Sequence, residues 1–325
     1  MLTNRFVVFH VKLAFACVLA AGSVASAQMT LTPQGTARNF TLSTFATGFA
    51  SSGGIGPIPI DFQNDGSILV GTYVDNRIYR FTNTDNQTVA STPFLTGYPN
   101  AELAHGIAHW GDRLFVSHYN SQTIDELNPD GSVNHTVAGG LGNARALLAN
   151  PANGHLFTST VQGVRDVNPN TGIFTTLTTQ ELDGITISPD GSTLYGAAIS
   201  GGAFGHLLGY NTTTGAVVFD SGFVPGGLDG TALGFGQRTG FIYGNLNNGN
   251  VVEINLSTLE QVTIATGGSR GDFVSSDPSG SGDLLLTQTD RIIRLSGIPT
   301  PGAAALLGVA GLFASRRRRS SGVVA

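Results

Sequence analysis

Six turn glycines recur along the chain at a nearly regular spacing. Their separations are 45, 43, 37, 49 and 42 residues, and Gly111 is the loosest match because it lies one residue early in its turn, before Asp112. A period of this length is typical of propellers and other repeat arrays, in which each repeat is one small structural unit. The six positions are Gly66, Gly111, Gly154, Gly191, Gly240 and Gly282.

The same β-rich runs surround each of these glycines. In the fourth repeat, for example, an apolar segment at 184–187 leads into the turn, and runs at 193–195, 207–210 and 217–219 follow it. Short runs of this kind, separated by Gly, Asn and Asp turns, predict four antiparallel strands per repeat. The body shows no sustained 3.6-residue apolar periodicity. We therefore predict an all-β fold of six four-stranded blades.

The sixth repeat predicts how the ring closes. After the run Arg291–Leu295 the chain passes directly into a Pro-rich tail, so this blade lacks a fourth strand. An unassigned strand, Asn39–Phe45, precedes the first repeat and can complete the blade, which hides two sheet edges that would otherwise invite aggregation. The prediction is a six-bladed β-propeller closed by its N-terminal strand. A β-sandwich is the alternative, but a sandwich does not require this period.

Composition excludes several classes of protein. Gly accounts for 45 of 325 residues, and only 11% of residues are charged, which argues against a coiled coil. Between residues 28 and 297 the chain has ten Arg, no Lys and all 21 Asp and Glu, so this body has a formal charge of -11. An acidic body repels the phosphates of nucleic acid, so we expect no nucleic-acid partner.

The N-terminus has the pattern of an export signal. Arg5 and Lys12 precede an apolar stretch at 13–21, and Ala25-Ser26-Ala27 provides the small residues that a signal peptidase recognises. We expect cleavage after Ala27, which makes residues 1–27 a signal peptide. Cys17 is the only cysteine in the sequence and lies in this segment. The exported body would then have no disulfide, no catalytic thiolate and no metal bound by cysteine.

The C-terminus, residues 298–325, has three parts. Pro299 and Pro301 form a stiff break, residues 303–314 are an apolar run, and a basic cluster follows at Arg316, Arg317, Arg318 and Arg319. A helix over the apolar run would be roughly 20 Å long, too short for a ~30 Å hydrocarbon core, which favours transient membrane insertion. The Arg cluster would stay on the cytoplasmic side and leave the body outside. A C-terminal helix packed on the body is the alternative, and it leaves the Arg cluster unexplained.

This tail resembles the PEP-CTERM sorting signal of exported bacterial proteins. Thr300 stands where that family commonly has Glu. The resemblance implies cleavage by an exosortase-type protease after export, and a final location in the cell envelope or the extracellular matrix. Together with the export signal and the repeats, this tail divides the chain into a signal peptide at 1–27, a β-propeller at 28–297 and a sorting signal at 298–325.

The first strand of each propeller blade lines the central channel, so the residues at its entry are the candidate ligand-binding residues. Ile55, Gly56 and Asn143 also lie at these positions, but six charged or titratable residues dominate them. They are His105, Arg145, Asp183, Asp229, Arg270 and Asp272. Arg270-Gly271-Asp272 also spells an adhesion tripeptide, but its place at a strand entry favours a pair of residues within the blade.

The body resembles six-bladed propellers of the NHL-repeat and gluconolactonase types, especially over 182–191 and 228–230. In gluconolactonase-type enzymes a divalent cation at the channel entry polarises the lactone carbonyl. The resemblance implies that Asp183 and Asp229 would provide two oxygen ligands, which suit Ca²⁺ or Mg²⁺. Here Gly56 and Arg145 occupy two further entry positions, and neither is a cation ligand.

His105 and His109 lie four residues apart on one strand, ~13 Å at ~3.3 Å per residue, so they cannot share a metal by themselves. His118 lies on the next strand and can approach one of them.

Two functions remain open from the sequence. The first is a non-catalytic binding or structural propeller without a cofactor, which binds an envelope partner or an extracellular polysaccharide. The second is a metal-dependent hydrolase or lyase of the gluconolactonase or streptogramin-lyase type. Fold alone does not decide between them.

Overall fold

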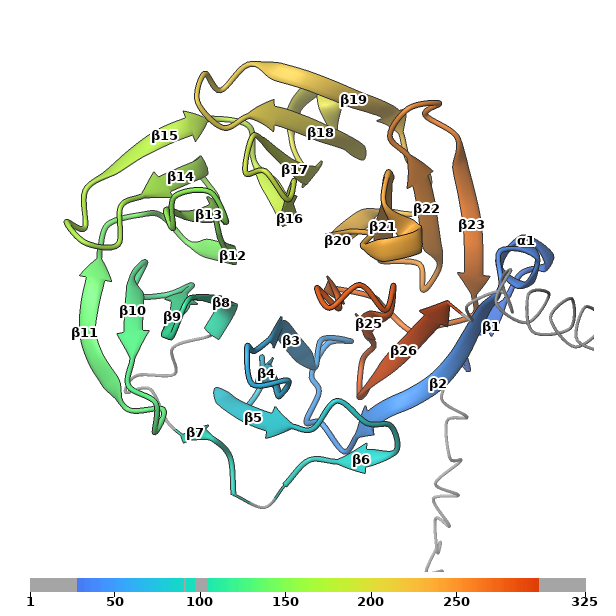
Figure 1. The fold of residues 1–325 in the computed structure, drawn as a ribbon, viewed down its shortest axis with the longest axis horizontal. Helices are drawn as coiled ribbons and strands as arrows, with labels where there is room; N and C mark the ends of the chain where they lie inside the picture. The colour runs from blue at the N-terminus through green and yellow to red at the C-terminus, as the bar shows by residue number, and fades with distance from the viewer. Residues whose placement is uncertain (1–27, 91, 97–103, 298–325) are drawn as a thin grey trace, which may run out of the picture.

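The computed structural model describes residues 28–90, 92–96 and 104–297. These residues form six sheets arranged as blades around a central axis, as Figure 1 shows, and the strands pair antiparallel apart from one parallel pair in the last blade. The fold is therefore an all-β six-bladed propeller, as predicted. The predicted signal peptide, the sorting signal and its apolar helix lie outside the described residues.

The first four blades have four strands each, and the chain passes from the channel outward in each of them. Blade 1 contains β3 (Pro57–Phe62), β4 (Ile68–Thr72), β5 (Arg77–Phe81) and β7 (Leu95–Thr96); blade 2 contains β8 (Ala104–Trp110), β9 (Arg113–His118), β10 (Ile124–Leu127) and β11 (Val133–Ala138); blade 3 contains β12 (Ala144–Ala149), β13 (Leu156–Thr160), β14 (Gly163–Val167) and β15 (Phe174–Thr178); blade 4 contains β16 (Leu182–Ile187), β17 (Thr193–Ala198), β18 (His206–Asn211) and β19 (Val217–Phe223).

The last two blades have five strands each, one more than predicted, because segments from elsewhere in the chain extend them. Blade 5 contains β20 (Leu228–Leu233), β21 (Phe241–Leu246), β22 (Val251–Asn255), β23 (Gln261–Thr266) and β1 (Thr30–Leu31); blade 6 contains β24 (Val274–Ser276), β25 (Leu284–Thr287), β26 (Arg291–Gly297), β2 (Phe40–Thr47) and β6 (Gln87–Thr88). The described residues also form three short helices, α1 (Pro33–Ala37), η1 (Gly201–Ala203) and η2 (Gly236–Arg238).

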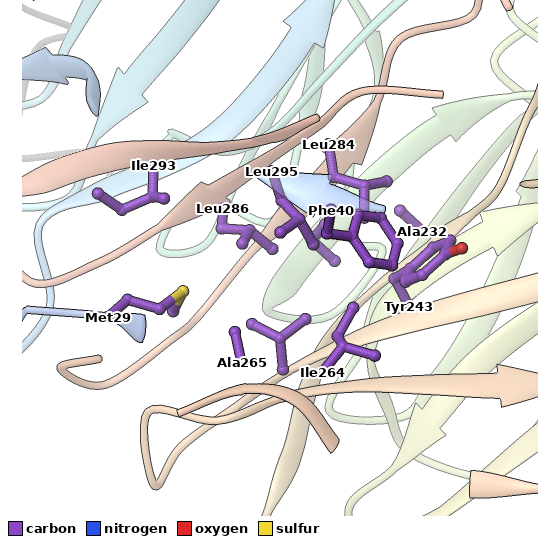
Figure 2. Close-up of a cluster of buried hydrophobic side chains, with 12 residues drawn as sticks. Met29, Phe40, Ala232, Tyr243, Ile264, Ala265, Leu284, Leu286, Ile293 and Leu295 are labelled. Atoms are coloured by element: carbon purple, nitrogen blue, oxygen red, sulfur yellow. The ribbon is translucent and has the colours of Figure 1, made fainter. Parts of the chain in front are cut away.

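Strand β2 closes the ring, as the unassigned N-terminal strand predicted. It pairs antiparallel with β26 from Phe40 opposite Gly297 to Thr47 opposite Arg291. Phe40 is buried and packs edge-to-face on Tyr243 of blade 5, with ring centroids 5.9 Å apart. Figure 2 shows Phe40 beside Tyr243, near Leu284 and Leu295. The N-terminal strand thus joins the core between the last two blades.

The six turn glycines have the geometry that the repeat requires. Each lies between the first and second strands of its blade and has a φ between +59° and +91°. This left-handed region favours glycine because a Cβ would be strained there. The regularly spaced glycines therefore mark the turn between the first and second strands of each blade.

Candidate functional site

The predicted entry residues meet at one end of the channel. His105, Arg145, Asp183, Asp229, Arg270 and Asp272 line a single cavity of about 120 Å³. Of the further entry positions, Ile55 also lines this cavity. Asn143 instead donates a hydrogen bond to the backbone carbonyl of Tyr119 (2.9 Å). A methyl group added at Gly56 would lie 2.0 Å from the Thr289 carbonyl oxygen, so Gly56 serves backbone packing.

The inner strands carry these residues at their entry ends, where the regular alternation of side chains is interrupted. In β16 the pairing with β17 shifts register between Leu182 and Ile185, so Asp183 lies within a β-bulge. Beyond the bulge Ile185 and Ile187 share one face, so a charged residue at the entry is followed by apolar residues deeper in the channel. Both Ile185 and Ile187 line a second cavity, which opens at the other end.

Between the two cavities the inner strands approach each other closely. A methyl group added at Gly184 would lie 2.7 Å from the Asp229 carbonyl oxygen, and one at Gly230 would lie 2.6 Å from the Phe273 Cα. A methyl group added at Gly106 would lie 2.5 Å from the backbone nitrogen of Leu147. Each of these glycines directly follows an entry residue. They allow the backbones of neighbouring inner strands to pack closely below the charged cluster, and we call this level the waist.

Two arginines provide the positive charge of the entry cavity. Arg145 pairs with Glu181, with its Nη1 3.2 Å from the carboxylate. Arg270 contacts Asp272 at 2.9 Å and Asp229 at 3.7 Å, and its Nε also donates to the Asn247 amide oxygen (2.9 Å). The Arg270–Asp272 contact confirms that this tripeptide forms a pair within the blade.

The three carboxyl groups are held in an environment that favours their protonated forms. Burial raises the pKa of Asp183, and it raises that of Asp229 well above the usual value, with a further increase from the neighbouring Asp183 and Asp272. Burial also raises the pKa of Asp272 to about 6, although Arg270 opposes this shift. A hydrogen bond between Asp229 and Asp183 contributes to the raised pKa of Asp229 and lowers that of Asp183. Of the pair, Asp229 is therefore the carboxyl group that more readily holds a proton.

His105 adds an aromatic and neutral element to the same cavity. Its ring lies between Tyr119 and Tyr73, with centroid distances of 4.9 and 5.7 Å. Burial, with smaller contributions from the nearby Arg145 and His118, lowers the pKa of His105 to about 4. At neutral pH this imidazole is uncharged, so the cavity combines two arginines, a carboxyl cluster and the rings of His105, Tyr73 and Tyr119.

These residues do not fit a divalent cation. The pKa values of Asp183 and Asp229 are raised and both carboxyl groups lie near arginines, whereas a Ca²⁺ or Mg²⁺ site needs several ionised or free oxygen ligands. Within residues 28–90, 92–96 and 104–297, no group of three or more His, Cys, Asp or Glu is arranged to hold a metal ion. His109 lies at the opposite end of the channel from His105. His118 pairs with Asp125, at 3.2 Å.

Several residues of the entry cavity were not predicted from the sequence. Tyr73 and Tyr119 follow the second strands of their blades, and Ile58 and Phe273 complete the wall. Glu181 acts through its ion pair with Arg145. The repeat offered a signal for the tyrosines, because each one ends the second β-rich run of its unit, at the same end of the channel as the entry residues.

The predicted sorting residues, Pro299, Pro301 and Arg316 to Arg319, lie outside the described residues. In the part of the chain that the structure describes, no helix is both long and apolar enough to cross a membrane.

Comparison with solved structures supports the propeller fold. A chain in the crystal structure of a mitotic checkpoint complex superimposes with a TM-score of 0.55 at 12% identity, covering 76% of this chain and 78% of the other. At this identity the similarity shows the fold alone, and 1505 chains in solved structures match, so the architecture is widespread. No protein-family model and no curated protein sequence matches the chain.

Proposed function

We propose that this chain is an exported β-propeller that binds, without catalysis, an uncharged polyhydroxylated ligand at the channel entry. The ligand class would be one sugar unit of an envelope or extracellular polysaccharide. The observation that carries the proposal is the convergence of His105, Arg145, Asp183, Asp229 and Asp272, from five blades, on one cavity.

The chemistry of the cavity suits hydroxyl groups. A sugar hydroxyl both donates and accepts hydrogen bonds, and here arginines donate, carboxylates accept and a protonated carboxyl group can do either. The half-buried tyrosines beside His105 add aromatic surface for the ring of a sugar. A volume of about 120 Å³ admits one small unit, so a longer chain would continue out of the channel entry.

Arg145 provides the test of this site. Saturation-transfer NMR or calorimetry on the exported chain, with a panel of neutral sugars and uronic acids, should detect saturable binding of a neutral sugar. Arg145→Gln should weaken that binding at least about tenfold, because a charged hydrogen bond is worth roughly 1.5–3 kcal/mol. Arg165→Gln is the matched control, since Arg165 lies in the same blade but bonds to Leu141, Gln162 and Thr176 instead.

Two results would contradict the binding proposal. One is the absence of saturable binding across the panel, and the other is an equal loss in Arg145→Gln and Arg165→Gln. The alternative hypothesis, a metal-dependent hydrolase, predicts that calcium raises the melting temperature of the wild type. It also predicts that the double variant Asp183→Asn/Asp229→Asn loses this effect. We expect calcium to have no effect on either protein.

The export and sorting part of the proposal rests on the two ends of the sequence. An intact-mass measurement on the extracellular protein should show loss of the first 27 residues and of the segment after about Pro301. Arg316 to Arg319 still attached in that fraction would overturn sorting by cleavage, without affecting the ligand site.

A further inference from the structure

The exit end of the channel holds the larger of the two cavities. It has a volume of about 460 Å³, and all six inner strands contribute to its wall. This is within the range of small-molecule sites, roughly 300–1,000 Å³. The waist at Gly106, Gly184 and Gly230 lies between it and the charged entry cavity.

The wall of this cavity is mainly hydrocarbon. Six apolar residues, from the inner strands of four blades or from loops next to inner strands, line the cavity: Ile107, Leu148, Ile187, Leu233, Phe235 and Phe273. Leu148, Ile187, Phe235 and Phe273 are only partly buried, so these side chains keep apolar surface facing the channel. Water in such a space would lie against apolar walls, and its release on binding an apolar molecule is favourable.

Most polar side chains of the wall are already paired within the protein. Asp61 contacts the His109 ring nitrogen at 2.8 Å. The Thr231 hydroxyl donates to the Gly184 carbonyl (2.9 Å), and the Thr186 hydroxyl accepts from the Leu233 amide (3.1 Å). A charged or strongly polar ligand would find few free partners here, whereas an apolar one needs none.

We infer that the exit cavity is a second binding site, which takes an uncharged and mainly hydrocarbon small molecule. Ser275, a half-buried hydroxyl residue in the wall, allows the ligand one hydroxyl or carbonyl group on the side of blade 6. The site is separate from the proposed sugar site, because its residues lie towards the opposite end of the channel and, among the described residues, the two cavities share only Phe273.

An uncharged fluorescent probe tests this inference. N-phenyl-1-naphthylamine should bind the exported wild-type chain saturably, with one probe per chain. Ala149→Phe fills the cavity without adding charge, and Ile187→Asp places a carboxylate in its wall. Each should weaken binding at least about tenfold. If Ile187→Asp fails to fold, Ala149→Phe and its melting temperature still decide the outcome.

Two controls separate the cavity from the outer surface. Ile173 is 69% exposed, and Val218, on the outer strand of blade 4, is 57% exposed. Ile173→Asp and Val218→Asp should leave probe binding within twofold of wild type, and so should Arg145→Gln in the entry cavity. No saturable binding by the wild type, or an equal loss in either surface variant, would overturn the inference.

Discussion

The two ends of the propeller channel are built largely by the same inner strands and yet have opposite chemistry. At the entry, strands β8, β12, β16 and β20 present His105, Arg145, Asp183 and Asp229 around about 120 Å³. At their other ends the same four strands line an apolar cavity of about 460 Å³. The difference arises within each strand, because the pairing shifts register at the entry residue and the residue types change from charged at that irregularity to mainly apolar beyond it.

This contrast shows that a propeller channel can hold two sites rather than one pore. At the entry, Asp183 raises the pKa of both Asp229 and Asp272, whereas the exit wall is mainly hydrocarbon and contains the Asp61–His109 pair. The waist lies between these environments. Three substitutions test this division, one at the waist and one at each end.

The largest effect is expected at the waist. In Gly184→Val the added Cβ would lie 2.7 Å from the Asp229 carbonyl oxygen and the Gly230 Cα, so the backbone of blade 5 would have to move. We expect a loss of about 3 kcal/mol in the free energy of unfolding, measured by urea denaturation. Gly202→Ala is the control, because a Cβ there meets no atom within 4 Å and the change should cost less than about 0.5 kcal/mol. Equal stability of the two variants would show that the strands do not pack tightly at this level.

The waist also shows how far the sequence predicts this molecule. The turn glycines, the blade count and the closing strand β2 follow from local patterns, because turn chemistry and strand period are written in neighbouring residues. The additions of β1 to blade 5 and of β6 to blade 6 do not, since two-residue strands such as Thr30–Leu31 and Gln87–Thr88 carry no period of their own.

The candidate sites show the same division. The entry residues could be listed from strand position, but Tyr73 and Tyr119 come from other strands, and their approach to His105 depends on the tertiary fold. The exit cavity was not anticipated, because apolar residues such as Ile187 and Leu233 have the same pattern whether they face a packed core or an open channel. The space between these side chains depends on how the six blades are arranged around the channel axis.

An intermediate effect is expected from Asp272 at the entry. Its folded pKa is about 6, above the usual carboxyl value, so the folded state retains a proton that the unfolded chain loses. The contribution of Asp272 to the free energy of unfolding is fully present below about pH 4 and is lost as the pH rises through about 6. Asp272→Asn should therefore be more stable than wild type above pH 6, by an amount on the order of 2 kcal/mol, with the difference shrinking towards pH 4. Unfolding curves with the same pH slope in both proteins would contradict this assignment.

The smallest effect is expected from His109 at the exit, in a different pH range. Its hydrogen bond to Asp61 raises the pKa of His109 above the usual 6.5, so the pair contributes stability below that pH and loses it as the pH rises through the raised pKa. Both side chains are partly exposed, which limits the contribution to about 1 kcal/mol or less. His109→Asn should remove a shallow decline in stability above pH 6.5, measured by urea denaturation at a series of pH values. Burial raises the pKa of Asp61 and His109 lowers it, so the substitution also changes the titration of Asp61 at lower pH, and only the range above pH 6.5 tests His109. An unchanged decline above pH 6.5 would show that Asp61 does not hold the proton of His109 in the folded state.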